Sequence, residues 1–171
     1  MLLAIDTSTQ WVGLALFDGA QVAGEMHWRT QHHHTVELAP TVQGLLQRCG
    51  LAPGQLTALA VALGPGSFTS LRIGLALAKG MALALNLPVV GIPTLNIQAY
   101  AQPVLDIPLI SVLQSGRGRL AVGLYANVMG AWQPQGEARV TTLEDLSASI
   151  HKPTFICGEL NSEERRVLAR K

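Results

Sequence analysis

The first residues that could take part in chemistry are Asp6, Thr7, Ser8 and Thr9, a carboxylate and three hydroxyls that follow a short apolar run. Oxygen ligands of this kind at the end of a strand can hold a Mg²⁺ ion or a phosphate group. The same side chains can instead close a tight turn by accepting hydrogen bonds from backbone N–H groups, and their local context favours this structural role. The candidate cofactor ligands are therefore Asp6, Thr7 and Ser8, and the alternative is that they only stabilise the turn.

A second candidate is the segment Gly64-Pro65-Gly66-Ser67-Phe68-Thr69, which separates a predicted strand from a predicted helix. Backbone N–H groups at the start of a helix can bind an anion, so Gly64, Gly66 and Ser67 could contact a phosphate. The segment is not a Walker A loop because no lysine follows, and Thr69 stands where GxGxxG requires its third glycine. In the structural alternative the glycines permit a tight turn, and Ser67 or Thr69 caps the helix.

A third candidate is the tract His32-His33-His34, with His27 nearby. Consecutive histidines cannot share one face of a strand, and no carboxylate or cysteine stands at ligand spacing from them. The sequence also contains no nucleophile elbow and no HExxH motif. We therefore predict no metal, no cofactor and no catalytic residue.

Composition suggests a globular chain with a covered surface. Of 171 residues, 49% are hydrophobic and only 13% are charged. A chain of this length can bury a core, and the low charged fraction indicates that a core or a partner covers much of its surface. The net charge of +1 gives no general electrostatic case for nucleic-acid binding by this chain alone.

Several features favour a cytoplasmic protein without a membrane span. The N-terminus lacks the basic region of a signal peptide. The two cysteines, Cys49 and Cys157, lie far apart, as expected for small buried side chains in a reducing compartment. The most apolar stretch, residues 71–85, contains Arg72 and Lys79 and is shorter than the roughly 20 apolar residues that a span needs.

Periodicity predicts how these residues are positioned. Alternating or continuous apolar runs predict strands at 2–6, 12–17, 21–28, 59–63 and 89–92, with an Asp18-Gly19 hairpin turn. Helical spacing predicts helices at 36–49, 71–85 and 94–101. Thr35 is the expected N-cap of the first helix, and Pro40 should kink it or trim its first turn. The resulting order, βββαβαβα, predicts an α/β fold with a mixed sheet and helices on its faces.

The second half of the chain resembles an incomplete repeat of the first in its order of predicted elements. Strands are predicted at 109–113, 119–126 and 154–157, with a helix at 143–150. A break near Gln102-Pro103 suggests two lobes, residues 1–102 and 103–171, of which the second is smaller.

The helix predicted at 71–85 is the most informative segment. Small residues stand four apart along it, which makes a flat face on which another helix can pack. Its other positions are bulky and apolar, so nearly its whole circumference should be buried. The first helix can cover only part of it, which favours a bundle with a partner over cover from within the chain. The expected interface residues are Val42, Leu45, Leu46, Arg72, Gly74, Ala76, Ala78, Gly80 and Ala84.

These residues resemble a known family. The chain is similar to the TsaB (YeaZ-like) tRNA threonylcarbamoyladenosine biosynthesis proteins, closely over residues 1–100 and loosely beyond. The resemblance rests on Leu3-Ala4-Ile5-Asp6-Thr7-Ser8-Thr9, His34-Thr35 leading to Leu38-Ala39-Pro40, Gly64–Thr69 with Leu71-Arg72-Ile73-Gly74, and Leu87-Pro88 with Gly91-Ile92.

The resemblance implies a two-lobed actin-like (ribonuclease H-like, ASKHA) fold and a role in adding a threonylcarbamoyl group to N6 of an adenosine beside the tRNA anticodon. In that family the catalyst is a paralogous subunit, TsaD, with a metal-binding His-x-x-x-His, and here Thr94 and Gln98 fall at the spacing of those histidines. The family's subunits join through a bundle of their first two helices, which would also serve a homodimer. TsaE is implied as an indirect third partner.

The chain also departs from the family. Members usually run some tens of residues longer, so the second lobe is expected to lack its usual last strands and helices, as a fragment or as a shortened member. The family's Asp-x-Arg before the second-lobe hairpin appears here with Gln114 in place of the aspartate.

Two functions remain open from the sequence. The first is a non-catalytic scaffold that binds TsaD. The second is an actin-like phosphotransferase or ATPase that binds ATP through Asp6, Thr7 and the 64–69 turn.

Overall fold

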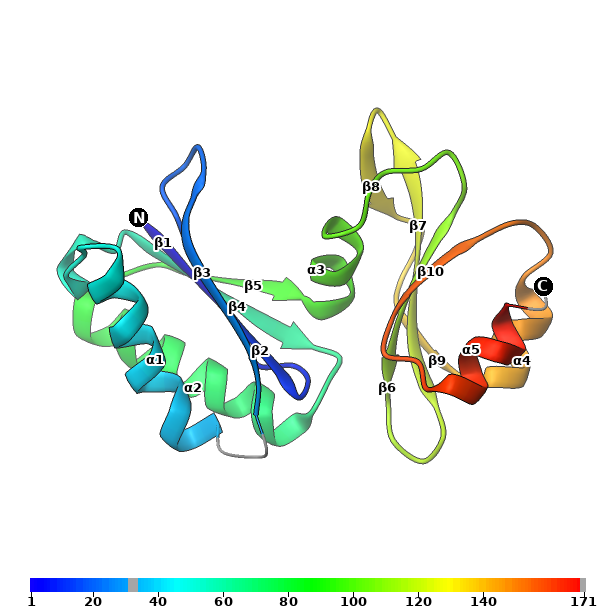
Figure 1. Cartoon of the computed structure of the whole chain (residues 1–171), viewed down its shortest axis with the longest axis horizontal. Helices are drawn as coiled ribbons and strands as arrows, with labels where there is room; N and C mark the ends of the chain where they lie inside the picture. Colours follow the sequence, from blue (N-terminus) through cyan, green and yellow to red (C-terminus); the bar gives the residue numbers. More distant parts are fainter. Residues whose placement is uncertain (31–33, 170–171) are drawn as a thin grey trace. The chain divides into compact units, whose positions relative to one another are not determined.

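The computed structural model describes residues 1–30 and 34–169, without the side chain of His34. The chain forms two compact units, Met1–Thr94 and Leu95–Lys171, each with its own sheet (Figure 1).

The first unit is a five-stranded mixed sheet with two long helices. Its strands follow the order β3-β2-β1-β4-β5. β1, β2 and β3 form an antiparallel meander, while β4 pairs parallel with β1 and β5 pairs parallel with β4. The elements are β1 (Leu2–Asp6), β2 (Trp11–Phe17), β3 (Val22–Arg29), α1 (His34–Arg48), a 3-10 turn (Pro53–Gln55), β4 (Ala58–Gly64), α2 (Phe68–Leu85) and β5 (Val89–Pro93).

The core of the first unit lies between one face of this sheet and the helices α1 and α2 (Figure 1). Alternate residues of β1, β2 and β4 point into it, as period-two side-chain alternation requires. Leu3, Leu16 and Leu59 are fully buried there, and α1 contributes Leu38 and Leu45. Burial of these side chains holds both helices on the same face.

The second unit is a smaller sheet with short helices. Its main strand order is β10-β6-β7-β8, and β9 also pairs with β7. β10 is parallel to β6, and the other pairs are antiparallel. The elements are α3 (Thr94–Tyr100), β6 (Leu109–Gln114), β7 (Leu120–Val128), β8 (Ala131–Pro134), β9 (Arg139–Thr141), α4 (Leu143–Ser149), β10 (Phe155–Gly158) and α5 (Ser162–Leu168).

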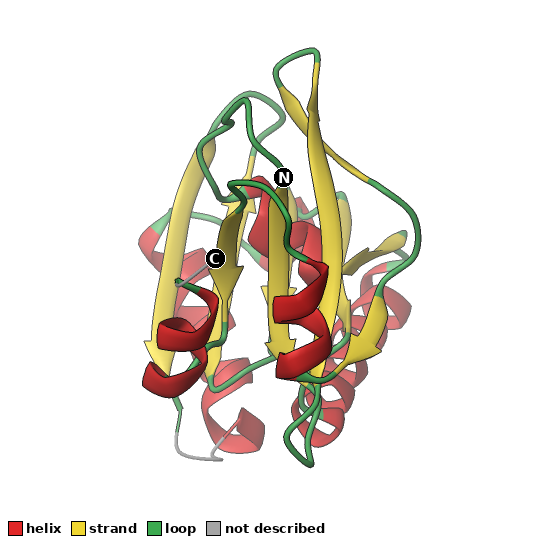
Figure 2. Ribbon diagram, turned by 90° about the vertical axis from the view of Figure 1, so that its right-hand side faces the viewer, coloured by secondary structure: helices red, strands yellow, loops and turns green. Residues whose placement is uncertain are grey.

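Both faces of the second sheet are covered. On one face α3 packs through Leu95 and Ala99 against a cluster that includes Leu109 and Trp132. On the other face α4 and α5 lie side by side (Figure 2), and Leu146 and Leu168 pack there. This packing explains why the two units divide after Thr94, because α3 belongs to the second core.

The two units repeat one topology, as the incomplete repeat in the sequence suggested. In each, two hairpin-connected strands are followed by a third, and a helix then leads to a strand parallel to the first. β6, β7, β8 and β10 occupy the places of β1, β2, β3 and β4, and α5 follows β10 as α2 follows β4.

The predicted strands and helices of the first unit are confirmed, with local differences. Thr35 is not the N-cap of α1, because the helix already includes His34. Pro40 stays inside an uninterrupted α1 and does not trim its first turn. α2 begins at Phe68 and not at Leu71, since Ser67 caps it. In the second unit, β8, β9 and α5 were not predicted.

Candidate functional site

The carboxyl ends of β1 and β4 meet the start of α2, and this strand-end cluster contains the candidate cofactor ligands. The Ser8 N–H donates to Asp6 Oδ1 at 2.8 Å, which closes the turn after β1. The Ser67 N–H donates to the Ser8 carbonyl oxygen at 2.7 Å, and Thr7 Oγ1 donates to the Ser70 carbonyl oxygen at 2.7 Å. These bonds fasten the segment after β1 to the first turn of α2.

The glycines of this cluster permit a close approach. A Cβ on Gly66 would collide with the Ser8 carbonyl oxygen, and Gly64 has a φ of +102°, which favours glycine. The Ser67 side chain accepts from the Ser70 N–H and caps α2. The structure thus brings all six candidate residues together at one turn that hydrogen bonds hold in place. They are Asp6, Thr7, Ser8, Gly64, Gly66 and Ser67.

Two of the backbone donors that could face a phosphate at this turn are occupied within the chain. The N–H groups of Ser8 and Ser67 both donate to protein oxygens, so neither points freely at a ligand. Among the described residues, the buried hydroxyl oxygens of Ser8 and Thr94 have no hydrogen-bond partner. The hydrogen bonds of Ser8 and Ser67 therefore account for the cluster as a structural element.

Two residues stand at the spacing of the TsaD histidines, Thr94 and Gln98. In this structure one is buried and the other is hydrogen bonded within the chain. Thr94 is buried at the start of α3. Gln98 Oε1 accepts from Ser111 Oγ at 2.8 Å, and the Gln98 carbonyl oxygen accepts from Gln102 Nε2. Within residues 1–30 and 34–169, no group of three or more His, Cys, Asp or Glu side chains is placed to hold a metal ion. His32 and His33 lie outside the described residues.

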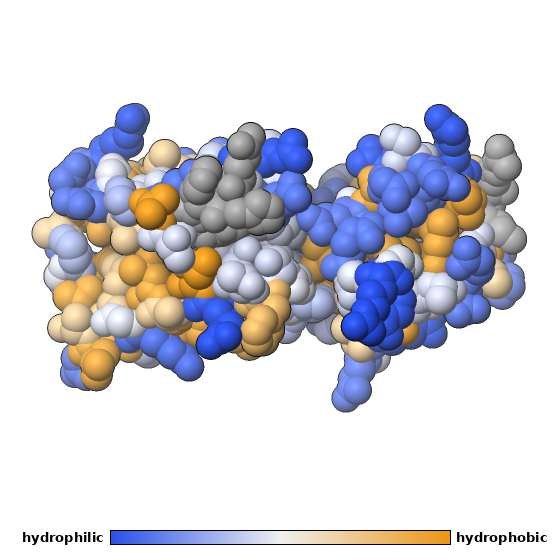
Figure 3. Space-filling view, turned by 90° about the horizontal axis from the view of Figure 1, so that it is seen from below, coloured by the Kyte–Doolittle hydropathy of each residue, from blue (hydrophilic) through white to orange (hydrophobic). Residues whose placement is uncertain are grey.

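The outer surface of α1 and α2, which we call the α1–α2 face, is an exposed apolar feature of the first unit. Figure 3 shows apolar residues gathered over it, and among them Phe68 is 74% exposed and Leu83 is 88% exposed. A groove of about 430 Å³ runs between the two helices, lined by apolar side chains that include Leu46, Leu77 and Met81. Exposed contiguous apolar surface of this kind is typical of protein interfaces.

The predicted interface residues divide into two sets. Gly74 and Ala78 are buried against the chain's own sheet, and a Cβ on Gly74 would collide with Thr7 Oγ1. Val42, Leu45 and Leu46 are also nearly fully buried, although Val42 and Leu46 form the floor of the groove. Arg72, Ala76, Gly80 and Ala84 are exposed, and a Cβ on Gly80 would meet no atom.

The sequence alone could not tell which small residues of α2 face the core. The stripe at positions 74 and 78 and the stripe at positions 76, 80 and 84 both consist of glycine and alanine. The position of Thr7 decides between them, because it lies against Gly74 and turns the opposite side of the helix outward.

By length and composition, α2 is long and apolar enough to cross a membrane, a criterion that the core helix of a soluble protein also meets. The segment predicted from the sequence, residues 71–85, was shorter because α2 begins at Phe68.

A polar cluster at the carboxyl end of β6 was not predicted. Gln114 Nε2 donates to both carboxylate oxygens of Glu164, at 3.0 and 2.9 Å, and to the Glu159 carbonyl oxygen at 3.3 Å. Asn161 and Glu164 form a capping box at the start of α5. The sequence Asn161-x-x-Glu164 carries the signal for this cap. The departure at Gln114 from the family pattern thus ties β6 to α5.

Burial raises the pKa of the Glu159 carboxyl, and a hydrogen bond from the Gln114 backbone N–H partly offsets the rise. Burial likewise raises the pKa of Tyr125 to about 12. The Tyr125 hydroxyl donates to Asn96 Oδ1 at 2.7 Å, which ties β7 to α3. Both groups lie in the second unit, and neither belongs to the strand-end cluster.

Comparison with known proteins identifies relatives. The family model described as "TsaD: tRNA N6-adenosine threonylcarbamoyltransferase" matches residues 28–151. The tRNA threonylcarbamoyladenosine biosynthesis protein TsaB of Bacillus subtilis (strain 168) is 36% identical over 124 residues, which cover 72% of this chain and 54% of that protein. The protein of the same name from Escherichia coli (strain K12) is 39% identical over 98 residues, 57% of this chain and 42% of that protein. The chain spans about half the length of the curated relatives it matches.

Two solved structures resemble the whole chain. YeaZ from Pseudomonas aeruginosa is 27% identical with a TM-score of 0.77, and the match covers 91% of this chain and 74% of that one. A Pseudomonas aeruginosa protein described as similar to peptidase YeaZ is 25% identical with a TM-score of 0.80, covering 99% and 89%. The predicted α/β fold of the actin-like, ribonuclease H-like class is confirmed, and the resemblance to TsaB and YeaZ is confirmed with it.

Proposed function

Because the chain belongs to the family of tRNA N6-adenosine threonylcarbamoyltransferase-like proteins and is TsaB-like within it, we propose that it serves tRNA threonylcarbamoyladenosine biosynthesis as a non-catalytic subunit. In this proposal the α1–α2 face binds the catalytic subunit TsaD. The observation that carries the proposal is the exposed apolar surface of α2, which the chain's own residues leave uncovered.

α2 presents two sides with different surroundings. One side of the helix, at Gly74 and Ala78, is packed on the sheet, and the opposite side, at Ala76, Gly80 and Ala84, has small side chains that keep the backbone accessible. Small residues four apart allow the axis of a second helix to come close. Leu83 beside this stripe is almost fully exposed, so a partner helix would remove its apolar surface from water.

The groove between α1 and α2 and the exposed charges of α2 indicate which side chains a partner would need. Bulky apolar side chains would fit the groove between α1 and α2, where Leu46, Leu77 and Met81 provide an apolar floor. Arg72 and Lys79 are exposed on α2, and the Arg72 guanidinium lies 5.2 Å from the centre of the Phe68 ring. A partner helix with apolar residues at its centre and carboxylates at its rim would match this surface.

The proposal assigns no catalytic step to this chain. Thr94 and Gln98 stand where the resemblance places the TsaD histidines, and an alcohol and an amide are poor ligands compared with imidazole. Gln98 is also hydrogen bonded to Ser111. We assign the chemistry to TsaD, with tRNA bound only within the complex, TsaE recruited indirectly, and the assembly in the cytoplasm. Without TsaD, the same face would serve a homodimer.

The test is size-exclusion chromatography with light scattering of this protein mixed with the TsaD of its own organism. We expect a heterodimer for the unaltered chain and its loss in Gly80→Leu, because a leucine on the exposed stripe blocks close helix packing. Since a Cβ at Gly80 meets no atom of this chain, the variant should stay folded. Ala148→Leu, on an exposed position of α4, is the matched control and should leave the complex intact. An undisturbed complex with folded Gly80→Leu would refute the interface.

The phosphotransferase alternative has a separate signature. It requires Mg²⁺-dependent ATP binding by the isolated chain that is lost in Asp6→Ala. The occupied backbone donors of Ser8 and Ser67 argue against it. Tight ATP binding without a complex with TsaD would establish this alternative and overturn the scaffold.

A further inference from the structure

The outer face of the first sheet, opposite α1 and α2, carries an exposed tryptophan. Val12 and Leu14 of β2 are buried in the core on the helix side of the sheet. Because side chains alternate along a strand, Trp11 and Gly13 point to the opposite, outer face. Trp11 is 58% exposed there. A single exposed apolar residue needs no explanation by itself, so its neighbours decide what this ring can do.

An arginine stands directly opposite Trp11 and is held in place. In the register of β2 and β3, Trp11 pairs with Arg29, so their side chains share the outer face with Cβ atoms about 5 Å apart. The Arg29 guanidinium donates to Gln10 Oε1 from Nη2 at 2.9 Å and from Nε at 3.3 Å. A guanidinium has five N–H donors, so those not turned to Gln10 can meet a phosphate oxygen. The planar charged group is thus positioned beside the indole ring.

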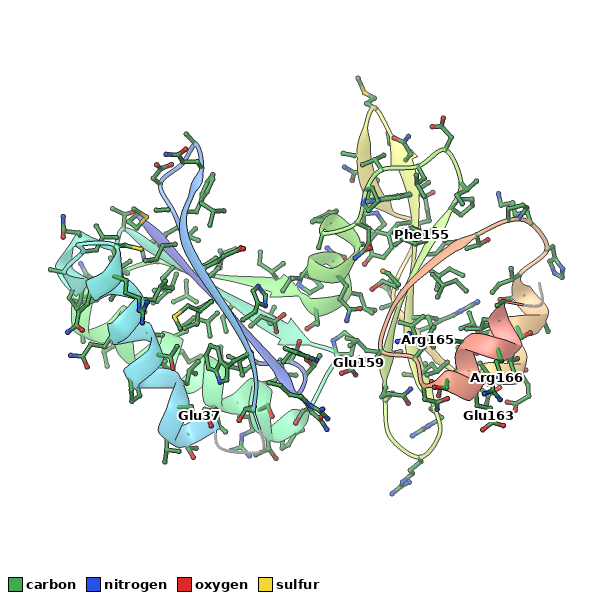
Figure 4. The ribbon with its side chains drawn as sticks, viewed as in Figure 1. Glu37, Phe155, Glu159, Glu163, Arg165 and Arg166 are labelled. Atoms are coloured by element: carbon green, nitrogen blue, oxygen red, sulfur yellow. The ribbon has the colours of Figure 1, made fainter. Side chains whose placement is uncertain are left out.

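A second ring lies in the next row of the same face. His27 is opposite Gly13 in the register of β2 and β3, and its imidazole lies over that glycine, since a Cβ on Gly13 would be 3.0 Å from His27 Cε1. Trp28, between His27 and Arg29, points the other way, and its Nε1 donates to Glu37 Oε2 of α1 at 3.0 Å (Figure 4). Alternation along β3 therefore places His27 and Arg29 together on the outer face.

These side chains form a surface that we call the Trp11 platform, which consists of Gln10, Trp11, His27 and Arg29. Trp11 and the glycine beneath His27 are two residues apart on β2, so the two rings stand in rows about 7 Å apart. Rings in adjacent rows of one sheet face are the arrangement with which sheet-based RNA-binding modules stack unpaired bases. Arg29 adds the positive charge that a sugar–phosphate backbone requires. A base within a duplex has no free face, so the platform fits unpaired nucleotides.

We propose that the Trp11 platform stacks unpaired nucleotides of the tRNA, with one base on Trp11, a neighbouring base on His27 and a phosphate against Arg29. The identity of the RNA rests on the proposed function, whereas the stacking rests on the platform itself. Glu25 limits the path of the strand, because it stands in the following row opposite Ala15 and its carboxylate repels phosphate. Stacking adds affinity base by base, so the platform contributes to binding within the complex although the chain has a net charge of only +1.

The first test measures, by filter binding, the affinity of the complex with TsaD for an unmodified tRNA transcript of the same organism. Trp11→Ala should weaken binding about tenfold, because it removes the surface on which one base stacks. Trp11→Leu should weaken it equally, while Trp11→Phe keeps a ring and should bind within about twofold of the unaltered chain. Phe17→Ala is the matched control. Phe17 is 39% exposed on the same face of β2, at the far end of the strand, and its removal should leave the affinity unchanged.

The salt dependence of binding separates the stacking from the ionic contact. In a plot of log affinity against log salt concentration, Arg29→Ala should reduce the slope by about 0.7, the value for one phosphate contact to a single strand. Trp11→Ala should instead lower the affinity at every salt concentration and leave the slope unchanged. Circular dichroism checks that each variant is folded, and size-exclusion chromatography checks that it still forms the complex.

Unchanged tRNA affinity in Trp11→Ala or Trp11→Leu would overturn the proposal, as would an equal loss in Phe17→Ala. Loss of the TsaD complex in folded Trp11→Ala would also overturn it, because the platform would then belong to a protein partner. If the unaltered chain forms no complex with TsaD, the proposed function fails and the platform is tested alone. In a Trp28→Phe/Trp132→Phe background Trp11 is the remaining tryptophan, and single-stranded oligoadenylate should quench its fluorescence in a saturable way that Arg29→Ala weakens. Absence of quenching would overturn the platform.

Discussion

Two glycines six residues apart in α2 should respond in opposite directions to the same substitution. Gly80 faces open space, so the methyl group of Gly80→Ala meets no atom and only improves helix propensity. A glycine-to-alanine change inside a helix stabilises by about 0.8–1 kcal/mol. We expect the free energy of unfolding of the first unit to rise by about that amount.

Gly74→Ala gains the same propensity but meets the side chain of Thr7. Its Cβ would collide with Thr7 Oγ1, which donates to the Ser70 carbonyl oxygen at 2.7 Å. Overpacking a core costs about 1–3 kcal/mol. Breaking this hydrogen bond costs about 1 kcal/mol more. After the propensity gain is subtracted, Gly74→Ala should destabilise the unit by about 1–3 kcal/mol.

The assay is urea unfolding followed by tryptophan fluorescence in a Trp132→Phe background, which leaves Trp11 and Trp28 as reporters of the first unit. The difference between the two variants should be about 2–4 kcal/mol. Adding Thr7→Ser to Gly74→Ala should not recover it, because the clash is with the oxygen. Equal stabilisation by both alanines would refute the packing of Thr7 on Gly74, and with it the assignment of the exposed side of α2.

Three further predictions concern stability. Ser67→Ala removes the N-cap of α2 and should cost about 1 kcal/mol in urea unfolding; an unchanged midpoint would mean that the cap is not formed. Tyr125→Phe leaves Asn96 Oδ1 without its donor and should lower the free energy of unfolding of the second unit by about 1–2 kcal/mol. The fluorescence of Trp132 in a Trp11→Phe/Trp28→Phe background reports this unfolding, and an unchanged stability would contradict the hydrogen bond. The pKa of Glu159 is raised in the folded state, so its contribution to stability is full below its unfolded pKa and is lost as pH rises through the folded value. Thermal unfolding of Glu159→Gln should therefore lack the loss of stability that the unaltered chain shows above the unfolded pKa, and identical pH profiles would contradict the burial of this carboxyl.

The sequence by itself determined the elements that depend on local interactions. The Asp18-Gly19 hairpin, the Ser67 cap and the αL residue Asn86 that ends α2 are each specified by a few neighbouring residues. Apolar periodicity gave the buried strands of the first unit for the same reason. The elements β8, β9 and α5 were not predicted, although the Asn161-x-x-Glu164 capping signal marks the start of α5 in the sequence.

The tertiary structure decided what each surface is available for. Composition could not separate the two small-residue stripes of α2, and only the contact with Thr7 places Gly74 inside and Gly80 outside. The strand-end residues 6–8 and 64–67 were expected together, but whether their donors were free depended on the approach of α2 to β1, which the sequence does not encode locally.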